Sequence, residues 1–154
     1  MHKVVAVFGK RVGMNILLID DEPDILRHMK KALQILGHTC DAFEDSRVAL
    51  NNFNKEKYDV VISDVLMPVL NGFAIAEKIR HIAPAVRILL ISGCSDKTLE
   101  DMAGRYNPEV CLKKPVDIRT MKLVLDNMAR ELTVDNRRDC TSPEVKSNEG
   151  RGTI

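Results

Sequence analysis

Short apolar runs alternate with longer amphipathic stretches from Asn15 to about Glu131. Three of the runs are apolar at nearly every position, which is typical of strands that are buried on both faces of a sheet. These runs are Ile16–Ile19, Tyr58–Ser63 and Val86–Ile91. Two shorter or more polar runs, Thr39–Phe43 and Val110–Lys113, predict two further strands.

An amphipathic stretch follows each predicted strand. The first begins at Pro23, which suits the first turn of a helix, and ends at Gly37, a residue type common just after helices. The other expected helices are Ser46–Asn54, Phe73–His81, Lys97–Arg105 and Asp117–Glu131. This alternation predicts an α/β fold, namely a doubly wound five-stranded parallel sheet of the flavodoxin-like (βα)5 type with strand order 2-1-3-4-5.

The two ends of the chain differ from this repeating region. Residues 1–13 are predicted to be an N-terminal extension, and Met14, directly before the first strand, is an alternative start of the protein. Residues 132–154 contain few large apolar side chains and are expected to form a disordered tail. The sequence therefore predicts a single domain over residues 14–131, with no output module of its own.

Composition and charge narrow the class of protein. The 154 residues are 45% hydrophobic and 29% charged, and the net charge of +1 gives no electrostatic case for binding DNA or an anionic membrane. No apolar run approaches the roughly 20 residues that a membrane helix needs. The four cysteines form no C-x-x-C pair, so neither a zinc site nor a disulfide framework is indicated, and we expect a cytoplasmic protein.

Polar residues gather where the predicted strands end. Asp20 and Asp21 follow the first strand, Asp64 the third, Ser92 the fourth and Lys114 the fifth. Because parallel strands end at one edge of a sheet, we expect these side chains to converge. Three carboxylates in one place need a cation, and hard oxygen ligands suit Mg²⁺. Beside a metal, Asp64 has two roles open to it: ligand, or nucleophile that forms an acyl phosphate.

Four segments together resemble the receiver domain of two-component response regulators. They are ILLIDDEPDI, YDVVISDVLMPVLNGF, RILLISG and LKKP, and they span roughly residues 14–131. The resemblance implies a stand-alone phosphoacceptor switch, not an enzyme, that takes a phosphoryl group from a sensor histidine kinase or a histidine phosphotransfer protein. It also implies an unknown downstream protein partner or a phosphoryl relay, without direct contact to DNA or membrane, and a possible phosphorylation-dependent dimer.

The resemblance assigns the metal ligands. Asp64 is the expected phosphoacceptor and a ligand of Mg²⁺. Asp21 is the expected direct ligand, and Asp20 is expected to act more through water. The backbone carbonyl of Leu66, two residues after the acceptor, is the third expected protein ligand.

The resemblance also assigns the groups that act on the phosphoryl group. Ser92 is the hydroxyl expected to move toward it. Lys114, rather than Lys113, is the lysine expected to face the site, because it adjoins Pro115. Strand alternation agrees, since it directs Lys113 to the opposite face. The bond before Pro115 is expected to be cis.

Cys111 departs from the family pattern. Receiver domains usually carry an aromatic residue three positions before the site lysine, and this residue turns inward when the hydroxyl residue moves. Ser92 and Cys111 are therefore the switch positions, but the cysteine is too small to act in that way. Either the switch is muted or another residue carries it, and Tyr106, in a segment longer than usual, is one candidate.

Two alternative functions stay open on the sequence alone. A pseudo-receiver adaptor would have the same fold without being phosphorylated, and Cys111 favours it. A Mg²⁺-dependent phosphohydrolase with an aspartyl-phosphate intermediate is less favoured, because the acids do not form an Asp-x-Asp motif and no substrate cap is present. A dinucleotide-binding domain does not fit, since no G-x-G-x-x-G follows the first strand.

Overall fold

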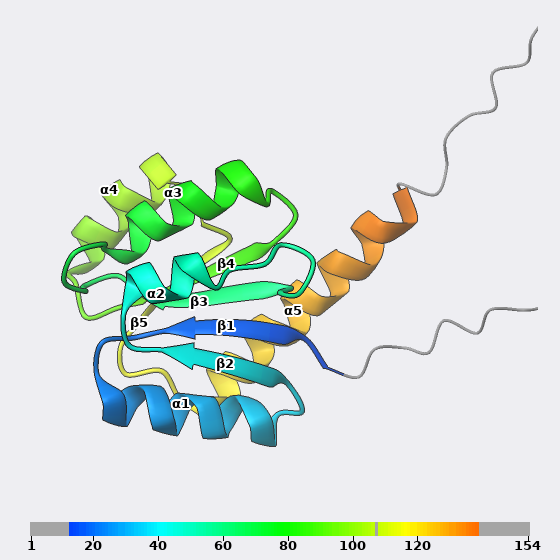
Figure 1. Ribbon diagram of the computed structural model, residues 1–154, viewed down its shortest axis with the longest axis horizontal. Helices are drawn as coiled ribbons and strands as arrows, with labels where there is room; N and C mark the ends of the chain where they lie inside the picture. The colour runs from blue at the N-terminus through cyan, green and yellow to red at the C-terminus, as the bar shows by residue number, and fades with distance from the viewer. Residues whose placement is uncertain (1–12, 107, 139–154) are drawn as a thin grey trace, which may run out of the picture.

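The computed structural model describes residues 13–106 and 108–138, and in this part of the chain five strands alternate with five helices (Figure 1). The strands are β1 (Asn15–Ile19), β2 (Thr39–Phe43), β3 (Val60–Asp64), β4 (Arg87–Ser92) and β5 (Val110–Lys113). The helices are α1 (Pro23–Ile35), α2 (Ser46–Asn51), α3 (Gly72–Ile82), α4 (Asp96–Tyr106) and α5 (Ile118–Arg138).

The strands form one parallel sheet in the order β2-β1-β3-β4-β5. The predicted fold and strand order are confirmed. The strand order reverses between β1 and β3: the chain runs from β1 to β2 on one side, and from β3 to β4 and β5 on the other. Strands β1 and β3 pair with each other at this point. The carboxyl ends of these two strands are the place where ligands bind in sheets of this kind.

Helices cover both faces of the sheet, with α1 and α5 on one face and α2, α3 and α4 on the other (Figure 1). The residues of β1 alternate between the two core layers. Ile16 and Leu18 pack in the layer of α1 and α5, whereas Leu17 and Ile19 pack in the layer of α2, α3 and α4. All four side chains are almost completely buried, which explains why this run is apolar at every position.

Local signals set several element boundaries. Pro23 occupies the first turn of α1, and Gly37, with φ of 89°, adopts the left-handed conformation that favours glycine after a helix. Asp45 and Asn71 cap α2 and α3, because their side chains accept hydrogen bonds from backbone N–H groups of the first turn.

Helix α2 is shorter than predicted. It ends at Asn51 rather than Asn54, and a turn then leads into the third strand. In this turn the ring of Phe53 stacks on Tyr58, with ring centroids 6.0 Å apart. Phe53 therefore packs against the core from this turn, although the sequence pattern had predicted that it lies within the helix.

Helix α5 is longer than predicted. It continues past Glu131 to Arg138, so the expectation of disorder from residue 132 is wrong for residues 132–138. Leu132 packs against the core layer below α5, which gives the helix an apolar contact beyond the predicted end. Residues 1–12 and 139–154, which hold most of the expected extension and tail, lie outside the described residues. No described helix is long and apolar enough to cross a membrane.

Candidate functional site

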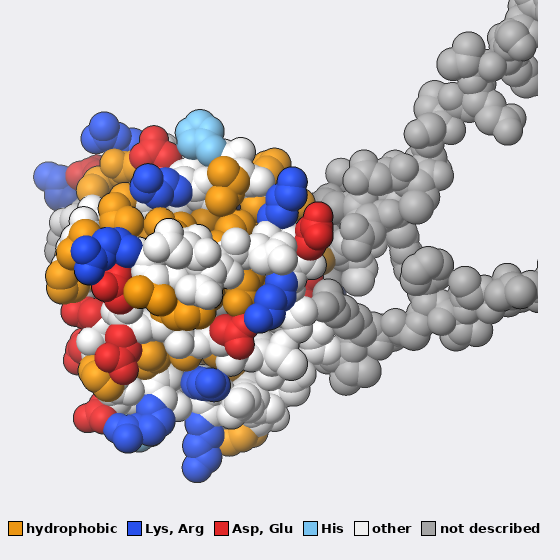
Figure 2. Space-filling model, viewed as in Figure 1, with side chains coloured by type: hydrophobic (Ala, Val, Ile, Leu, Met, Phe, Trp, Pro, Cys, Tyr) orange, Lys and Arg blue, Asp and Glu red, His pale blue; other side chains and the backbone are white. Residues whose placement is uncertain are grey.

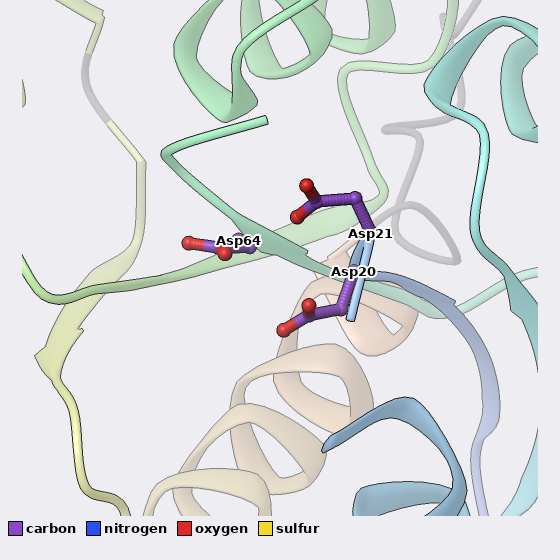
Figure 3. Close-up of side chains that lie close together, drawn as sticks. All are labelled: Asp20, Asp21 and Asp64. Atoms are coloured by element: carbon purple, nitrogen blue, oxygen red, sulfur yellow. The ribbon is translucent and has the colours of Figure 1, made fainter. Parts of the chain in front are cut away.

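Two neighbouring strands bring three carboxylates to one edge of the sheet. Asp64 is the last residue of β3, and Asp20 and Asp21 directly follow β1. Because Ile19 pairs with Ser63 in the parallel register, the residues that come next lie side by side. Figure 3 shows their three side chains extending in the same direction from the two strand ends.

The three acids are close enough to hold a single cation. One carboxylate oxygen of each residue lies within 4.8 Å of the others. Asp20 and Asp64 are 2% and 5% exposed, and Asp21 is the most exposed of the three. Buried carboxylates need a compensating positive charge, and a set made only of oxygen donors fits Mg²⁺. The site therefore fits the predicted metal.

The Lys114 side chain joins the two buried acids. Its Nζ donates hydrogen bonds to Asp64 Oδ2 at 3.0 Å and to Asp20 Oδ2 at 3.2 Å. Burial by itself lowers the pKa of Lys114, but the hydrogen bonds and charges of the two acids outweigh it and raise this pKa above its ordinary value. The lysine is therefore charged, and it compensates the acids in part.

The residues around Lys114 agree with the sequence, with one addition. Lys113 points away and donates to Asp96 at 2.8 Å, as expected from strand alternation. The Lys114–Pro115 peptide bond is cis. The addition is Glu22, which was not predicted to reach the site and whose carboxylate lies 3.8 Å from the Lys114 ammonium. The position of Glu22 directly after Asp20 and Asp21 was the only feature of the sequence that could have indicated this contact with Lys114.

Ser92 lies beside the acceptor strand. Asp64 pairs with Ile91 in the β3–β4 register, so Ser92 stands one residue further toward the site edge. Its side chain is fully buried, and its Oγ accepts a hydrogen bond from the Cys94 N–H at 3.0 Å. Because the hydroxyl accepts here, its proton stays available for donation to a group bound at Asp64.

The loop between β3 and α3 holds Asp64 through the main chain. The Leu66 N–H donates to Asp64 Oδ1 at 3.2 Å. The expected use of the Leu66 carbonyl as a metal ligand stays a prediction. Gly72 closes the loop by donating to the Val65 carbonyl at 3.0 Å, and a Cβ at Gly72 would lie 2.4 Å from the Asp64 carbonyl oxygen. Only glycine therefore fits at position 72. This close approach of Gly72 to Asp64 could not be predicted from the sequence.

Cys111 lies in the core layer under α3 and α4. It pairs with Leu90 in the β4–β5 register and is partly buried, and burial raises the pKa of its thiol. The aromatic ring in this region comes from another element. Tyr106, the last residue of α4, stacks on Phe73 of α3, with ring centroids 5.2 Å apart and planes inclined by 27°.

A doubly wound sheet with clustered acids and a bridging lysine at its switch point defines the class of signalling domains found in two-component systems. This chain belongs to the response regulator receiver domain family, whose model matches residues 16–126. The resemblance drawn from the four motifs is thereby confirmed.

Curated relatives include both a small receiver protein and a large kinase. The response regulator receiver protein CpdR of Brucella abortus is 26% identical over 113 residues, which are 73% of this chain and 94% of CpdR. The sensor histidine kinase RcsC of Escherichia coli K12 is 30% identical over 112 residues, again 73% of this chain. The chain matches only 12% of the length of RcsC.

Solved structures show the same fold. A response regulator receiver domain protein from Clostridium thermocellum is 30% identical with a TM-score of 0.74, and the match covers 79% of this chain and 98% of that one. The chemotaxis response regulator CheY4 of Vibrio cholerae is 26% identical with a TM-score of 0.68, and the match covers 75% of this chain and 98% of CheY4.

Proposed function

We propose that Asp64 accepts a phosphoryl group from a phosphohistidine in a Mg²⁺-dependent reaction, and that this modification switches an interaction with a partner protein or relays the phosphoryl group. One observation carries the proposal: the Asp64 carboxylate lies next to a charged lysine and two further acids. That arrangement supplies what phosphoryl transfer requires, namely a positioned nucleophile and compensation of charge.

The chemistry assigns a task to each side chain. An Asp64 carboxylate oxygen attacks phosphorus, the phosphorus–nitrogen bond to histidine breaks, and the imidazole nitrogen keeps the bonding electron pair. Lys114 stabilises the negative charge on the phosphoryl oxygens, and the Ser92 hydroxyl donates to one of them. Mg²⁺ held by Asp20, Asp21 and Asp64 would supply further positive charge to the same oxygens.

The proposed phosphodonor is a sensor histidine kinase or a histidine phosphotransfer protein. Support comes from RcsC, a sensor histidine kinase of which one segment is similar to this chain. The proposed target is a protein rather than DNA, because acidic and basic side chains are intermixed on the surface seen in Figure 2 and the net charge is +1. A cytoplasmic location and phosphorylation-dependent dimerisation belong to the same proposal.

The domain is proposed to act as a switch and not as an enzyme with turnover. Each chain would be phosphorylated once from a small donor and would slowly lose the group again. The complete set of Asp20, Asp21, Asp64, Ser92 and Lys114 in one place argues against a pseudo-receiver, which would not need it. Repeated turnover on small phosphate esters would instead support a phosphohydrolase.

The test is phosphorylation with acetyl phosphate and Mg²⁺, followed by mass spectrometry of the intact chain. We expect one added phosphoryl group on the wild type and none on Asp64→Asn. Asp24→Asn is the matched control, because Asp24 belongs to the same acidic run but pairs with Arg27 on the surface. An Asp64→Asn protein labelled like the wild type, or a wild type without label, would contradict the proposal.

A further inference from the structure

Helix α4 is held to the domain by few contacts. Of its residues 96–106, only Leu99 is buried, and Gly104 lies inside the helix, where glycine weakens it. The ion pair of Asp96 with Lys113 joins two exposed side chains and adds little. An element with so little buried apolar surface can shift at a small cost in free energy.

The start of α3 is attached to the acceptor residue much more tightly. Gly72, its first residue, lies against the Asp64 carbonyl and donates to Val65. Phe73 comes next in the chain and is 2% exposed, so its ring has no room to move independently. The Phe73 ring is therefore held in place directly beside the residue that contacts the Asp64 main chain.

Tyr106 connects the loosely held helix to this anchored ring. It is the last residue of α4, and its ring stacks on Phe73 at a centroid distance of 5.2 Å. The Arg105 guanidinium lies 5.5 Å from the centre of the same tyrosine ring. Besides Tyr106, the partly buried Met102 of α4 packs against this core layer, and Leu99 is the one buried residue of the helix. The aromatic stack is therefore a direct contact between α4 and the first turn of α3.

Cys111 occupies the same core layer without filling the space of a ring. Its small side chain leaves the aromatic contact of this region to Tyr106 and Phe73. Ser92 ties the other end of α4, because its hydroxyl accepts from the Cys94 N–H just before the helix begins. The segment just before α4 thus contacts Ser92, and the last residue of α4 contacts the residue that follows Gly72.

We propose that the Phe73–Tyr106 stack couples the state of Asp64 to the position of α4, which makes Tyr106 a positioning residue of the switch in place of Cys111. This inference rests on the proposed function, because it requires that Asp64 be modified. It predicts that α4 and the Tyr106 ring respond together when a phosphoryl-like group occupies the site.

The tyrosine ring can be observed directly. The chain has no tryptophan and two tyrosines, of which Tyr58 packs near β2 and donates to Asp41 at 2.7 Å. In a Tyr58→Phe background, Tyr106 is the only tyrosine, so its ring NMR signals can be followed as Mg²⁺ and beryllofluoride, a mimic of a carboxylate-bound phosphoryl group, are added. We expect these signals to shift. Unchanged ring signals on a chain that binds beryllofluoride would overturn the inference.

Hydrogen exchange of residues 96–106 provides the second measurement. We expect beryllofluoride with Mg²⁺ to change exchange of α4 by about fivefold or more in the wild type, which corresponds to ordinary coupling between two sites. Tyr106→Leu should lose most of this change, whereas Tyr106→Phe, which keeps the ring, should retain it. An equal response in the leucine variant would overturn the inference.

Phosphorylation by acetyl phosphate separates failure of the inference from failure of the proposed function. Tyr106→Leu should still accept one phosphoryl group, because Tyr106 touches none of the reacting atoms. If the wild type is labelled while α4 and Tyr106 do not respond, only the coupling is wrong. If the wild type is never labelled, the proposed function fails and the coupling falls with it. Should the leucine variant not fold, the ring signals in the Tyr58→Phe chain decide.

Discussion

The Lys114 ammonium lies 3.0 Å from the Asp64 carboxylate, although 50 positions separate the two residues in the chain. The same ammonium also reaches Asp20 at 3.2 Å. Lys114 therefore occupies the position of a partial counter-ion next to the three acids. It lowers the cost of keeping them together and stands where a phosphoryl group on Asp64 would carry its negative charge.

Replacing this lysine should separate phosphorylation from metal binding. We expect Lys114→Met to slow phosphorylation by acetyl phosphate by about 100-fold, because one stabilising donor is lost. Mg²⁺ should bind at least as tightly as before, since a positive charge beside its ligands is gone. Intact-mass kinetics and a Mg²⁺ titration measure the two effects. Lys113→Met is the control, and equal rates for both variants would contradict the role of Lys114.

Mg²⁺ should stabilise the folded domain through the acidic cluster. At about 100 times the dissociation constant, binding adds about 2.7 kcal/mol to the free energy of unfolding. Asp21→Asn should remove most of this gain, because it deletes a ligand that is largely at the surface and contributes little to packing. Thermal unfolding with and without Mg²⁺ measures the gain. Asp24→Asn should behave as the wild type, and an undiminished gain in Asp21→Asn would show that the metal binds elsewhere.

Val69 should be a site where glycine stabilises the fold. Its φ is 70°, in the left-handed region that is unfavourable for a β-branched residue, and it is 71% exposed. The Leu70 N–H donates to the Pro68 carbonyl at 2.9 Å, which closes a tight turn around it. We expect Val69→Gly to raise the free energy of unfolding by about 0.5–1 kcal/mol, because relief of strain exceeds the added entropy of the unfolded chain.

Urea unfolding tests this expectation, and another exposed valine supplies the control. Val48 lies within α2, where glycine is unfavourable, so Val48→Gly should lower the free energy of unfolding by about 1 kcal/mol. A Val69→Gly protein that is destabilised to the same extent would show that the turn is not strained.

Stability should fall in mild acid because of His38. Its Nδ1 accepts a hydrogen bond from the Met14 N–H at 3.1 Å, which requires an unprotonated nitrogen. Burial lowers the pKa of His38 below its ordinary 6.5, with Asp126 acting in the opposite direction and Lys122 adding to the lowering. A histidine with a depressed folded-state pKa stabilises the fold above about pH 6.5, and this contribution is lost as the pH falls through the folded-state pKa.

Urea unfolding between about pH 8 and about pH 5 measures this loss. His38→Gln should reduce the dependence on pH, whereas His81→Gln, which changes an exposed histidine, should not. An unchanged pH profile in the His38 variant would assign the effect to other groups.

The fold and most of the site followed from the sequence, because both depend on patterns that are local in the chain. A run such as Ile16–Ile19 is buried on both faces wherever it stands in a parallel sheet, so its strand was predictable. Parallel strands end at a common edge, and this alone predicts that Asp20, Asp21 and Asp64 lie together, as they do in the structure. The choice of Lys114 over Lys113 followed from strand alternation and the resemblance.

The boundaries that were missed depend on contacts between distant parts of the chain. Helix α5 runs on to Arg138, with Leu132 still packed on the core, whereas the polar composition of the segment indicated its end at Glu131. Helix α2 stops at Asn51, and Phe53 stacks on a residue beyond the turn. Helix propensity alone does not contain these contacts.

The sequence by itself determined which residues form the sheet, which edge carries the acids and which family they indicate. Only the tertiary structure decided that Glu22 approaches Lys114, that Gly72 lies against the Asp64 carbonyl, and that Tyr106 stacks on Phe73. The physical reason is that periodicity fixes the direction of side chains within one element, whereas the distance between side chains of different elements depends on how the elements pack.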